Sequence, residues 1–163
     1  MKILSMKTTI FLGAMLSLLV CLMFTGCSNS ETNSTSRGLT DFAHIEEEYL
    51  ATIDSLDWPD GVELPKKLEN EDTGASFQVG YGETRASNLW EYSWMKEWLD
   101  TYNTDPERAE KALEELEKAF DMPYMGIDRC DDATRNYLRE NIDKAKLGDP
   151  SGFTESIRAN YAN

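Results

Sequence analysis

The sequence contains few of the residues that enzymes use most often in catalysis. Its 163 residues include one histidine and three cysteines. So few histidines leave little room for pairing a nucleophile with a base, and no G-x-S-x-G segment is present. Asp and Glu are so frequent that finding two carboxylates says little about a hydrolytic site. We therefore expect a protein that is not an enzyme and that needs no cofactor.

Basic residues are also scarce. The chain has 16 Lys or Arg against 30 Asp or Glu, which gives a formal net charge of −14. A charge of this size repels nucleic acid and anionic membrane surfaces, so neither is expected as a partner of the folded part. It can attract a cationic peptide, a divalent metal or a basic patch on another protein.

Long apolar stretches are limited to one short run near the start. Residues Ile10 to Phe24 carry no charge, and Lys2 and Lys7 precede them. A transmembrane helix needs about 20 apolar residues, so these fifteen are too few to span a bilayer comfortably. A short apolar core behind a basic start is typical of a signal peptide.

The apolar run ends in the four residues Phe24-Thr25-Gly26-Cys27. This segment resembles the lipobox of bacterial lipoproteins, although Phe24 stands where Leu is usual. The resemblance implies that residues 1–26 are a signal peptide and that Cys27 is diacylated and becomes the first mature residue. It also implies a lipid anchor (palmitate or a similar acyl chain) at the extracytoplasmic face of a cell membrane. Removing the first 26 residues takes away two lysines and no acid, which leaves a net charge of −16.

Residues 27–39 are expected to form a tether. The stretch after Cys27 is rich in Ser, Asn and Thr, and it lacks the apolar surface that would offset the entropy of ordering it. Ser-rich tethers are common in Gram-positive lipoproteins, so a Gram-positive host is favoured. The remaining residues 40–163 suffice for one domain. Its one thiol, Cys130, has no partner for an internal disulfide and is expected to be a small buried hydrophobe, with a reactive or intermolecular thiol as the alternative.

Apolar residues recur at helical spacing through most of this domain. Phe42, Ile45, Tyr49 and Ile53 are three or four residues apart, as on one face of a helix. Asp105-Pro106 supplies a cap and a favoured first residue. The pattern predicts an all-α fold, a small irregular bundle of four to five helices with one long irregular loop at 62–84. The expected helices run from about Thr40 to Leu56, Arg85 to Tyr102, Pro106 to Phe120 and Asp132 to Leu147, with a short one after Pro150.

Three tryptophans offer the best candidate ligand site. Trp90, Trp94 and Trp98 fall on one helix face, and Trp58 and Tyr81 lie in the same half of the domain. Such a stripe could be a platform for a sugar, a peptide or an apolar ligand. The simpler interpretation is that the stripe forms the bundle core. Any of these rings that is exposed would mark the site.

Two weaker signals concern anions and metals. Backbone amides in the segment 80–84, which precedes a helix, could receive an anion, although a glycine turn explains the segment equally well. His44 with Glu47 or Glu48 could supply two metal ligands, fewer than a zinc site requires. The acidic groups do not follow a calcium-loop spacing and are expected to be solvated charge or helix caps, namely Glu69, Glu71, Asp72, Asp128, Asp131 and Asp132. We therefore expect no metal.

The sequence leaves three functional hypotheses. The first is a surface-exposed lipoprotein whose acidic helical domain is an interaction module for an envelope protein or a cationic peptide. The second is a small-ligand binder that uses the 62–84 loop and the tryptophan helix. The third is a carboxylate-based cell-wall hydrolase, which would require two carboxyls facing each other in a cleft.

Overall fold

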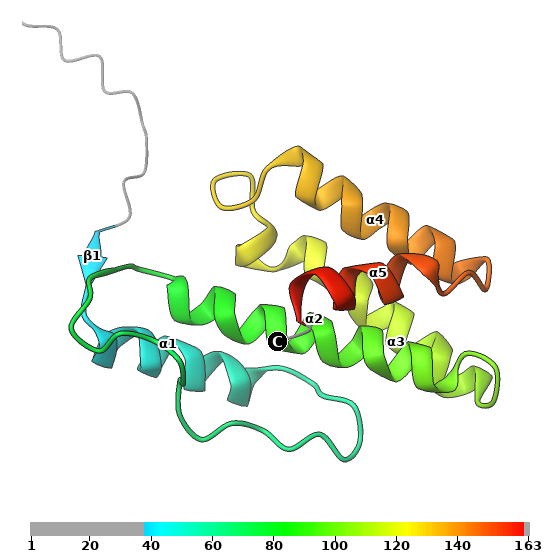
Figure 1. The fold of residues 1–163 in the computed structure, drawn as a ribbon, viewed down its shortest axis with the longest axis horizontal. Coiled ribbons are helices and arrows are strands. Elements are labelled where there is room, and N and C mark those ends of the chain that lie inside the picture. The colour runs from blue at the N-terminus through cyan, green and yellow to red at the C-terminus, as the bar shows by residue number, and fades with distance from the viewer. Residues whose placement is uncertain (1–37, 162–163) are drawn as a thin grey trace, which may run out of the picture. The chain divides into compact units, whose positions relative to one another are not determined.

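The computed structural model describes residues 38–161, which form five helices and a two-stranded ladder (Figure 1). The strands β1 (Leu39–Thr40) and β2 (Phe77–Gln78) pair antiparallel. Two short 3₁₀ helices, η1 (Lys118–Asp121) and η2 (Pro123–Met125), follow the third helix. The prediction of a small all-α bundle with one long loop is confirmed. The helices are α1 (Phe42–Ser55), α2 (Tyr81–Thr101), α3 (Pro106–Glu117), α4 (Asp132–Lys146) and α5 (Ser151–Asn160).

The predicted signal peptide and Cys27 lie outside the described residues, as does most of the predicted tether. Its last two residues, Gly38 and Leu39, are described, and Leu39 pairs with Gln78 across the ladder. Between residues 38 and 161, no helix combines the length and the apolar composition needed to cross a bilayer.

Three helices begin with an aspartate cap. The carboxylates of Asp41, Asp105 and Asp131 each accept a hydrogen bond from the backbone N–H three residues later, at 3.0, 3.2 and 2.7 Å. Each bond satisfies an amide that has no partner inside the helix. The cap predicted at Asp105 is confirmed, and of the two candidate caps Asp131 and Asp132 it is Asp131 that caps α4; both caps depend only on local sequence.

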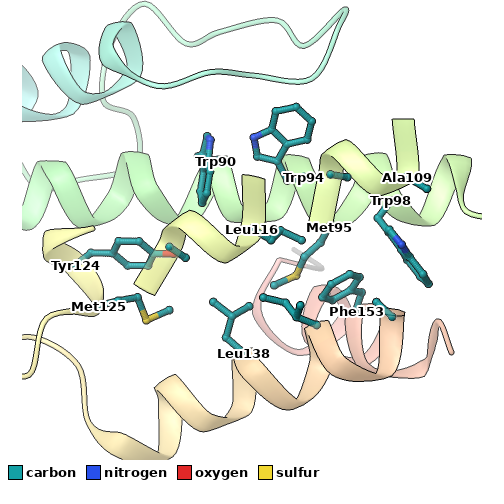
Figure 2. Packing of buried hydrophobic residues seen from close by; sticks show 14 residues of the cluster. Trp90, Trp94, Met95, Trp98, Ala109, Leu116, Tyr124, Met125, Leu138 and Phe153 are labelled. Atoms are coloured by element: carbon teal, nitrogen blue, oxygen red, sulfur yellow. The ribbon is translucent and has the colours of Figure 1, made fainter. Parts of the chain in front are cut away.

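Helix α2 is the central element, and its two ends pack in different clusters. Its C-terminal half contributes three tryptophans to a core shared with α3, α4 and α5 (Figure 2). Its N-terminal half packs with α1 and the long loop through a smaller set of buried residues: Ile45, Tyr49, Ile53, Leu68 and Ala86. Trp58 contacts both clusters.

The start of α2 differs from the prediction. The helix begins at Tyr81, four residues before the expected start at Arg85, so the long loop ends at Gly80. Gly80 has a positive φ of 89°, which favours glycine. At Gly82 an added Cβ would lie 1.9 Å from the backbone oxygen of Ile45, so only glycine allows α1 and α2 to approach this closely.

Candidate functional site

Trp90 and Trp94 belong to the core. Each is 1% exposed, and their indole N–H groups donate to the backbone oxygen of Asp57 at 2.8 and 3.1 Å. The structure therefore corrects the platform interpretation for these two residues. Both rings are sealed by the neighbouring helices, and both indole donors are already used.

Trp58 and Tyr81 do not extend a ligand platform either. Trp58 is partly buried and donates its indole N–H to the backbone oxygen of Ile53 at 2.9 Å. Tyr81 donates its hydroxyl to Glu71 at 2.9 Å, and its ring lies 5.3 Å from that of Phe77. Both side chains fix the long loop against α1 and α2.

Trp98 lines a surface cavity. This cavity, of about 510 Å³, lies between α3 and the end of α4, and we call it the α3–α4 groove. Trp98 stacks on Tyr102 with ring centroids 4.6 Å apart and meets Phe153 edge-on at 5.3 Å. The groove is lined by Trp98, Tyr102, Pro106, Ala109, Glu110, Leu113, Glu114, Glu117, Ala145, Lys146 and Gly148.

The indole N–H of Trp98 also differs from that of the other tryptophans. Trp58, Trp90 and Trp94 each donate to a backbone oxygen. Within the described part of the chain, the Trp98 indole N–H donates to no acceptor. Its nitrogen is nevertheless not fully buried, so it keeps some contact with solvent. Buried indole N–H groups usually find an acceptor. Trp98, which lines the groove, therefore carries an indole donor with no acceptor among the described residues.

The rim of the groove is acidic. Glu110 and Glu114 are exposed, lie one helical turn apart on α3, and form no ion pair with any residue in 38–161. Glu117 continues the row and is paired with Lys146 of α4. The groove thus combines an apolar floor with two glutamates that form no ion pair among the described residues, although Lys118, which pairs with Glu115, also interacts electrostatically with Glu114.

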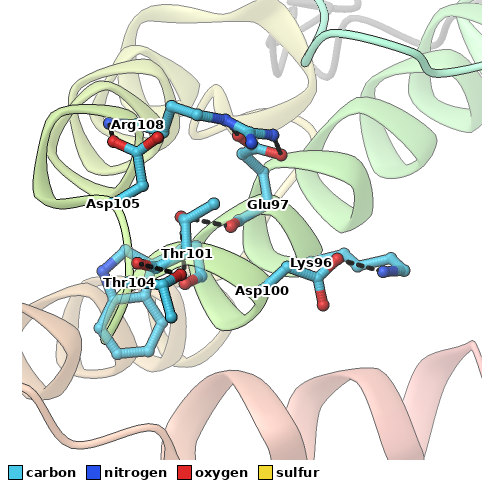
Figure 3. Close-up of polar contacts among 8 residues, drawn as sticks. Lys96, Glu97, Asp100, Thr101, Thr104, Asp105 and Arg108 are labelled. Carbon is cyan, nitrogen blue, oxygen red and sulfur yellow. Dashed lines mark hydrogen bonds and ion pairs between the residues drawn. The ribbon is translucent and has the colours of Figure 1, made fainter.

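An ion pair between the buried Glu97 and the half-exposed Arg108 joins α2 to α3 (Figure 3). Glu97 is 9% exposed, and its two carboxylate oxygens accept from Arg108 Nε and Nη2 at 2.7 and 2.9 Å. This two-pronged contact joins α2 to the first turn of α3 and fixes the angle of the corner between them. It therefore keeps the wall of the groove at a set distance from its floor.

A second cavity, of about 520 Å³, lies between α2, η2, α4 and α5. We call it the Glu91 cleft. Glu91 Oε2 accepts a hydrogen bond from the Tyr124 hydroxyl at 2.8 Å. The cleft is lined by Thr84, Asn88, Glu91, Tyr124, Met125, Arg129, Cys130, Asp131, Thr134, Tyr137, Leu138, Ser156, Asn160 and Tyr161.

Burial shifts the protonation of the groups in this cleft. It raises the pKa of Glu91 to about 7, because dense packing disfavours the charged carboxylate; the hydrogen bond from Tyr124 acts in the opposite direction. Burial and the nearby Glu91 also raise the pKa of Tyr124 and of Tyr161. A carboxyl that titrates near neutral pH inside a cleft is a frequent mark of a functional site. Glu91 was not among the residues predicted from the sequence. Only its position directly after Trp90, on a helix rich in aromatic residues, could have drawn attention to it.

The segment 80–84 does receive an anion, but the anion belongs to the protein. Glu48 of α1 accepts from the backbone N–H of Gly80 at 2.7 Å and of Gly82 at 3.1 Å. These amides are the ones that a bound phosphate would need. His44 Nε2 lies 3.3 Å from Oε1 of Glu48, one of the two carboxylates considered with it. Residues 38–161 contain no group of three His, Cys, Asp or Glu that could hold a metal.

The acidic groups noted in the sequence have structural roles. Glu71 accepts from Tyr81 and pairs with Arg85 at 3.3 Å, and Glu69 pairs with Lys67 at 2.9 Å. Asp131 caps α4. Cys130 is free and partly buried, and burial raises the pKa of its thiol, which disfavours the reactive thiolate.

Comparison with known proteins finds no match among family models, curated proteins or solved structures. A function can therefore be inferred only from the two cavities and from the sequence.

Proposed function

We propose that this protein is a lipid-anchored, extracytoplasmic lipoprotein whose helical domain binds a cationic segment of an envelope protein or peptide. The binding site is the α3–α4 groove. One observation carries the proposal: the groove brings Trp98 and Tyr102 together with Glu110 and Glu114, two exposed glutamates that form no ion pair within residues 38–161.

The groove suits an amphipathic ligand. Apolar side chains of the ligand would cover the partly exposed Tyr102 and Leu113 and gain about 25 cal/mol per Å² of apolar surface removed from water. Glu110 and Glu114 are spaced to meet two basic side chains that lie one helical turn apart on a ligand helix. The strongly negative net charge of the chain would speed the encounter with such a ligand.

The proposed anchor places this groove where such partners occur. Acylation at Cys27 would hold the domain at the membrane surface through the tether at 27–39, because two or more acyl chains bind stably. We expect Cys27→Ala to accumulate as an unprocessed precursor without acyl label, as measured by gel mobility and radiolabelled fatty acid. Normal acyl incorporation in this variant would contradict the anchor.

Calorimetric titration of the purified protein tests the groove. The ligand is an amphipathic helical peptide with two lysines four residues apart beside a leucine face. We expect the double variant Glu110→Gln/Glu114→Gln to bind about tenfold more weakly, since each exposed ion pair contributes up to about 1 kcal/mol. The matched control is Glu140→Gln/Glu155→Gln, which removes the same charge from exposed positions outside the groove. Equal weakening in both variants, or no binding by the unmodified protein, would overturn the proposal.

The two alternatives differ in their support. The small-ligand hypothesis gains from the Glu91 cleft, in which Thr84 is the one lining residue from the 62–84 segment that was predicted to take part in ligand binding. For a cell-wall hydrolase, Asp131 is the other carboxylate lining this cleft, and it is engaged in capping α4.

A further inference from the structure

We propose that the Glu91 cleft is a second binding site, one that takes a small organic cation such as an alkylammonium group. The inference is independent of the α3–α4 groove, since the two cavities share no lining residue.

The carboxyl of Glu91 has one oxygen to offer to a ligand. Oε2 accepts from Tyr124 at 2.8 Å, while Oε1 accepts no hydrogen bond from the residues described. Glu91 is partly rather than fully buried, and it lines the cavity. An ammonium N–H could therefore reach Oε1 and form a charge-assisted hydrogen bond without displacing Tyr124.

Aromatic residues from three elements line the same cleft. Tyr124 comes from η2, Tyr137 from α4 and Tyr161 from α5. Tyr161 is held by its hydroxyl, which donates to the backbone oxygen of Asn88 at 3.1 Å, and by its ring contact with Tyr92 at 4.9 Å. Tyr137 is 40% exposed. Tyrosine faces attract cations, and a carboxylate among such rings is a common arrangement for ammonium recognition.

The other charges in the cleft favour a cation over an anion. Arg129 is the basic residue of the lining, and it is paired with Glu83 at 2.6 Å. Asp131 adds a negative charge. An anionic ligand would therefore meet two carboxylates and an arginine that is already neutralised.

The same cleft makes cation binding depend on pH. Of the titratable groups that line it, Tyr124, Tyr161 and Cys130 have raised pKa values and stay protonated between pH 6 and 8, and Asp131 has a lowered pKa and stays charged. Tyr137 and Arg129 also line the cleft, and Arg129 is paired with Glu83. A carboxyl with a pKa of about 7 is ionised in roughly one molecule in ten at pH 6 and nine in ten at pH 8. Affinity for a cation should therefore rise about tenfold between these pH values.

Titration of the full chain with n-propylammonium chloride, followed by ¹H–¹⁵N NMR at pH 6 and pH 8, tests the site. We expect shifts in the amides of the cleft lining and a dissociation constant about tenfold lower at pH 8. The neutral isostere 1-propanol should produce no such pH dependence. Equal affinity at the two pH values, or equal binding of 1-propanol, would overturn the proposal.

Variants separate this site from a general surface effect. Glu91→Gln keeps the shape of the side chain and should abolish the pH dependence, with affinity about tenfold weaker at pH 8. Tyr137→Leu, at a residue already 40% exposed, should weaken binding about threefold while leaving the thermal midpoint nearly unchanged. Glu110→Gln/Glu114→Gln should bind n-propylammonium as the unmodified protein does. Unaltered affinity in Glu91→Gln, or a loss of affinity in the groove variant, would contradict the assignment.

Discussion

The α3–α4 groove and the Glu91 cleft have similar volumes, about 510 and 520 Å³, and both combine aromatic rings with carboxylates. They differ in where the carboxylate lies. In the groove, Glu110 and Glu114 stand exposed above an apolar floor of Trp98 and Tyr102. In the cleft, the Glu91 carboxyl is packed inside, against the Tyr124 hydroxyl.

This difference in position sets how each site responds to solution conditions. Exposed carboxylates stay ionised near neutral pH, and their attraction for a ligand is screened by salt. A packed carboxyl is screened less but changes its protonation with pH. The same residue types therefore give one site sensitive to salt and another sensitive to pH.

The largest effect on the free energy of unfolding is expected from substituting Trp98, because this residue belongs both to the floor of the groove and to the core. Trp98 is 2% exposed and packs against Tyr102 and Phe153. We expect Trp98→Ala to lower the free energy of unfolding by about 3–5 kcal/mol, measured by urea denaturation, because it leaves a large cavity. Leu147→Ala, at a residue 87% exposed, is the control and should change stability by less than about 0.5 kcal/mol. A loss under 1 kcal/mol in Trp98→Ala would show that the floor is not part of the core.

A smaller effect on stability is expected from the cleft, and it depends on pH. The pKa of Glu91 is raised in the folded state, so the folded protein holds a proton that the unfolded chain has lost between about pH 5 and pH 7. The contribution of this group to stability is therefore present at low pH and is lost as pH rises to about 7. We expect a loss of about 2 kcal/mol, after allowing for the partial exposure of the side chain.

Urea denaturation at pH 5 and pH 8 checks this, with Glu91→Gln expected to lose that part of the pH dependence. Glu155→Gln, an exposed residue on α5, should keep the slope of the unmodified protein. Identical slopes for Glu91→Gln and the unmodified protein would place the Glu91 carboxyl in contact with solvent.

The smallest effect on stability is expected on the rim of the groove. Glu110→Gln/Glu114→Gln should change the free energy of unfolding by less than about 0.5 kcal/mol, since both side chains are exposed and unpaired within the described residues. The unmodified protein should lose affinity for the cationic peptide between 50 and 500 mM salt, while n-propylammonium binding in the cleft changes less. A destabilised double variant would mean that these glutamates hold the fold rather than a ligand.

Features that depend only on residues close together in the sequence could be predicted from it. Three helices could be predicted in this way: α1 from its apolar spacing, and α3 and α4 from their aspartate caps. Each of these patterns lies within a few residues of sequence. The start of α2 could not be predicted in the same way. Its capping carboxylate, Glu48, lies 32 residues before Gly80 in the sequence and meets it only once α1 packs on α2.

The two candidate sites show the same limit. The sequence spacing of Trp90, Trp94 and Trp98 is the same, so it does not tell them apart. In the structure, Trp90 and Trp94 donate to the backbone oxygen of Asp57, whereas Trp98 lines the groove. Glu91 resembles any other glutamate on a helix until η2 and α5 enclose it. Burial of a charged group is a tertiary property, and local patterns do not report it.

The central claim is that the α3–α4 groove binds a cationic amphipathic segment, and NMR mapping of the bound peptide tests it most directly. The protein is labelled with ¹⁵N and titrated with the lysine-containing peptide described above. The account predicts that the largest shifts occur at the Trp98 indole N–H and in the amides of residues 109–117, with saturation at one peptide per protein. Shifts spread evenly over the acidic surface, with the Trp98 indole signal unmoved, would contradict it.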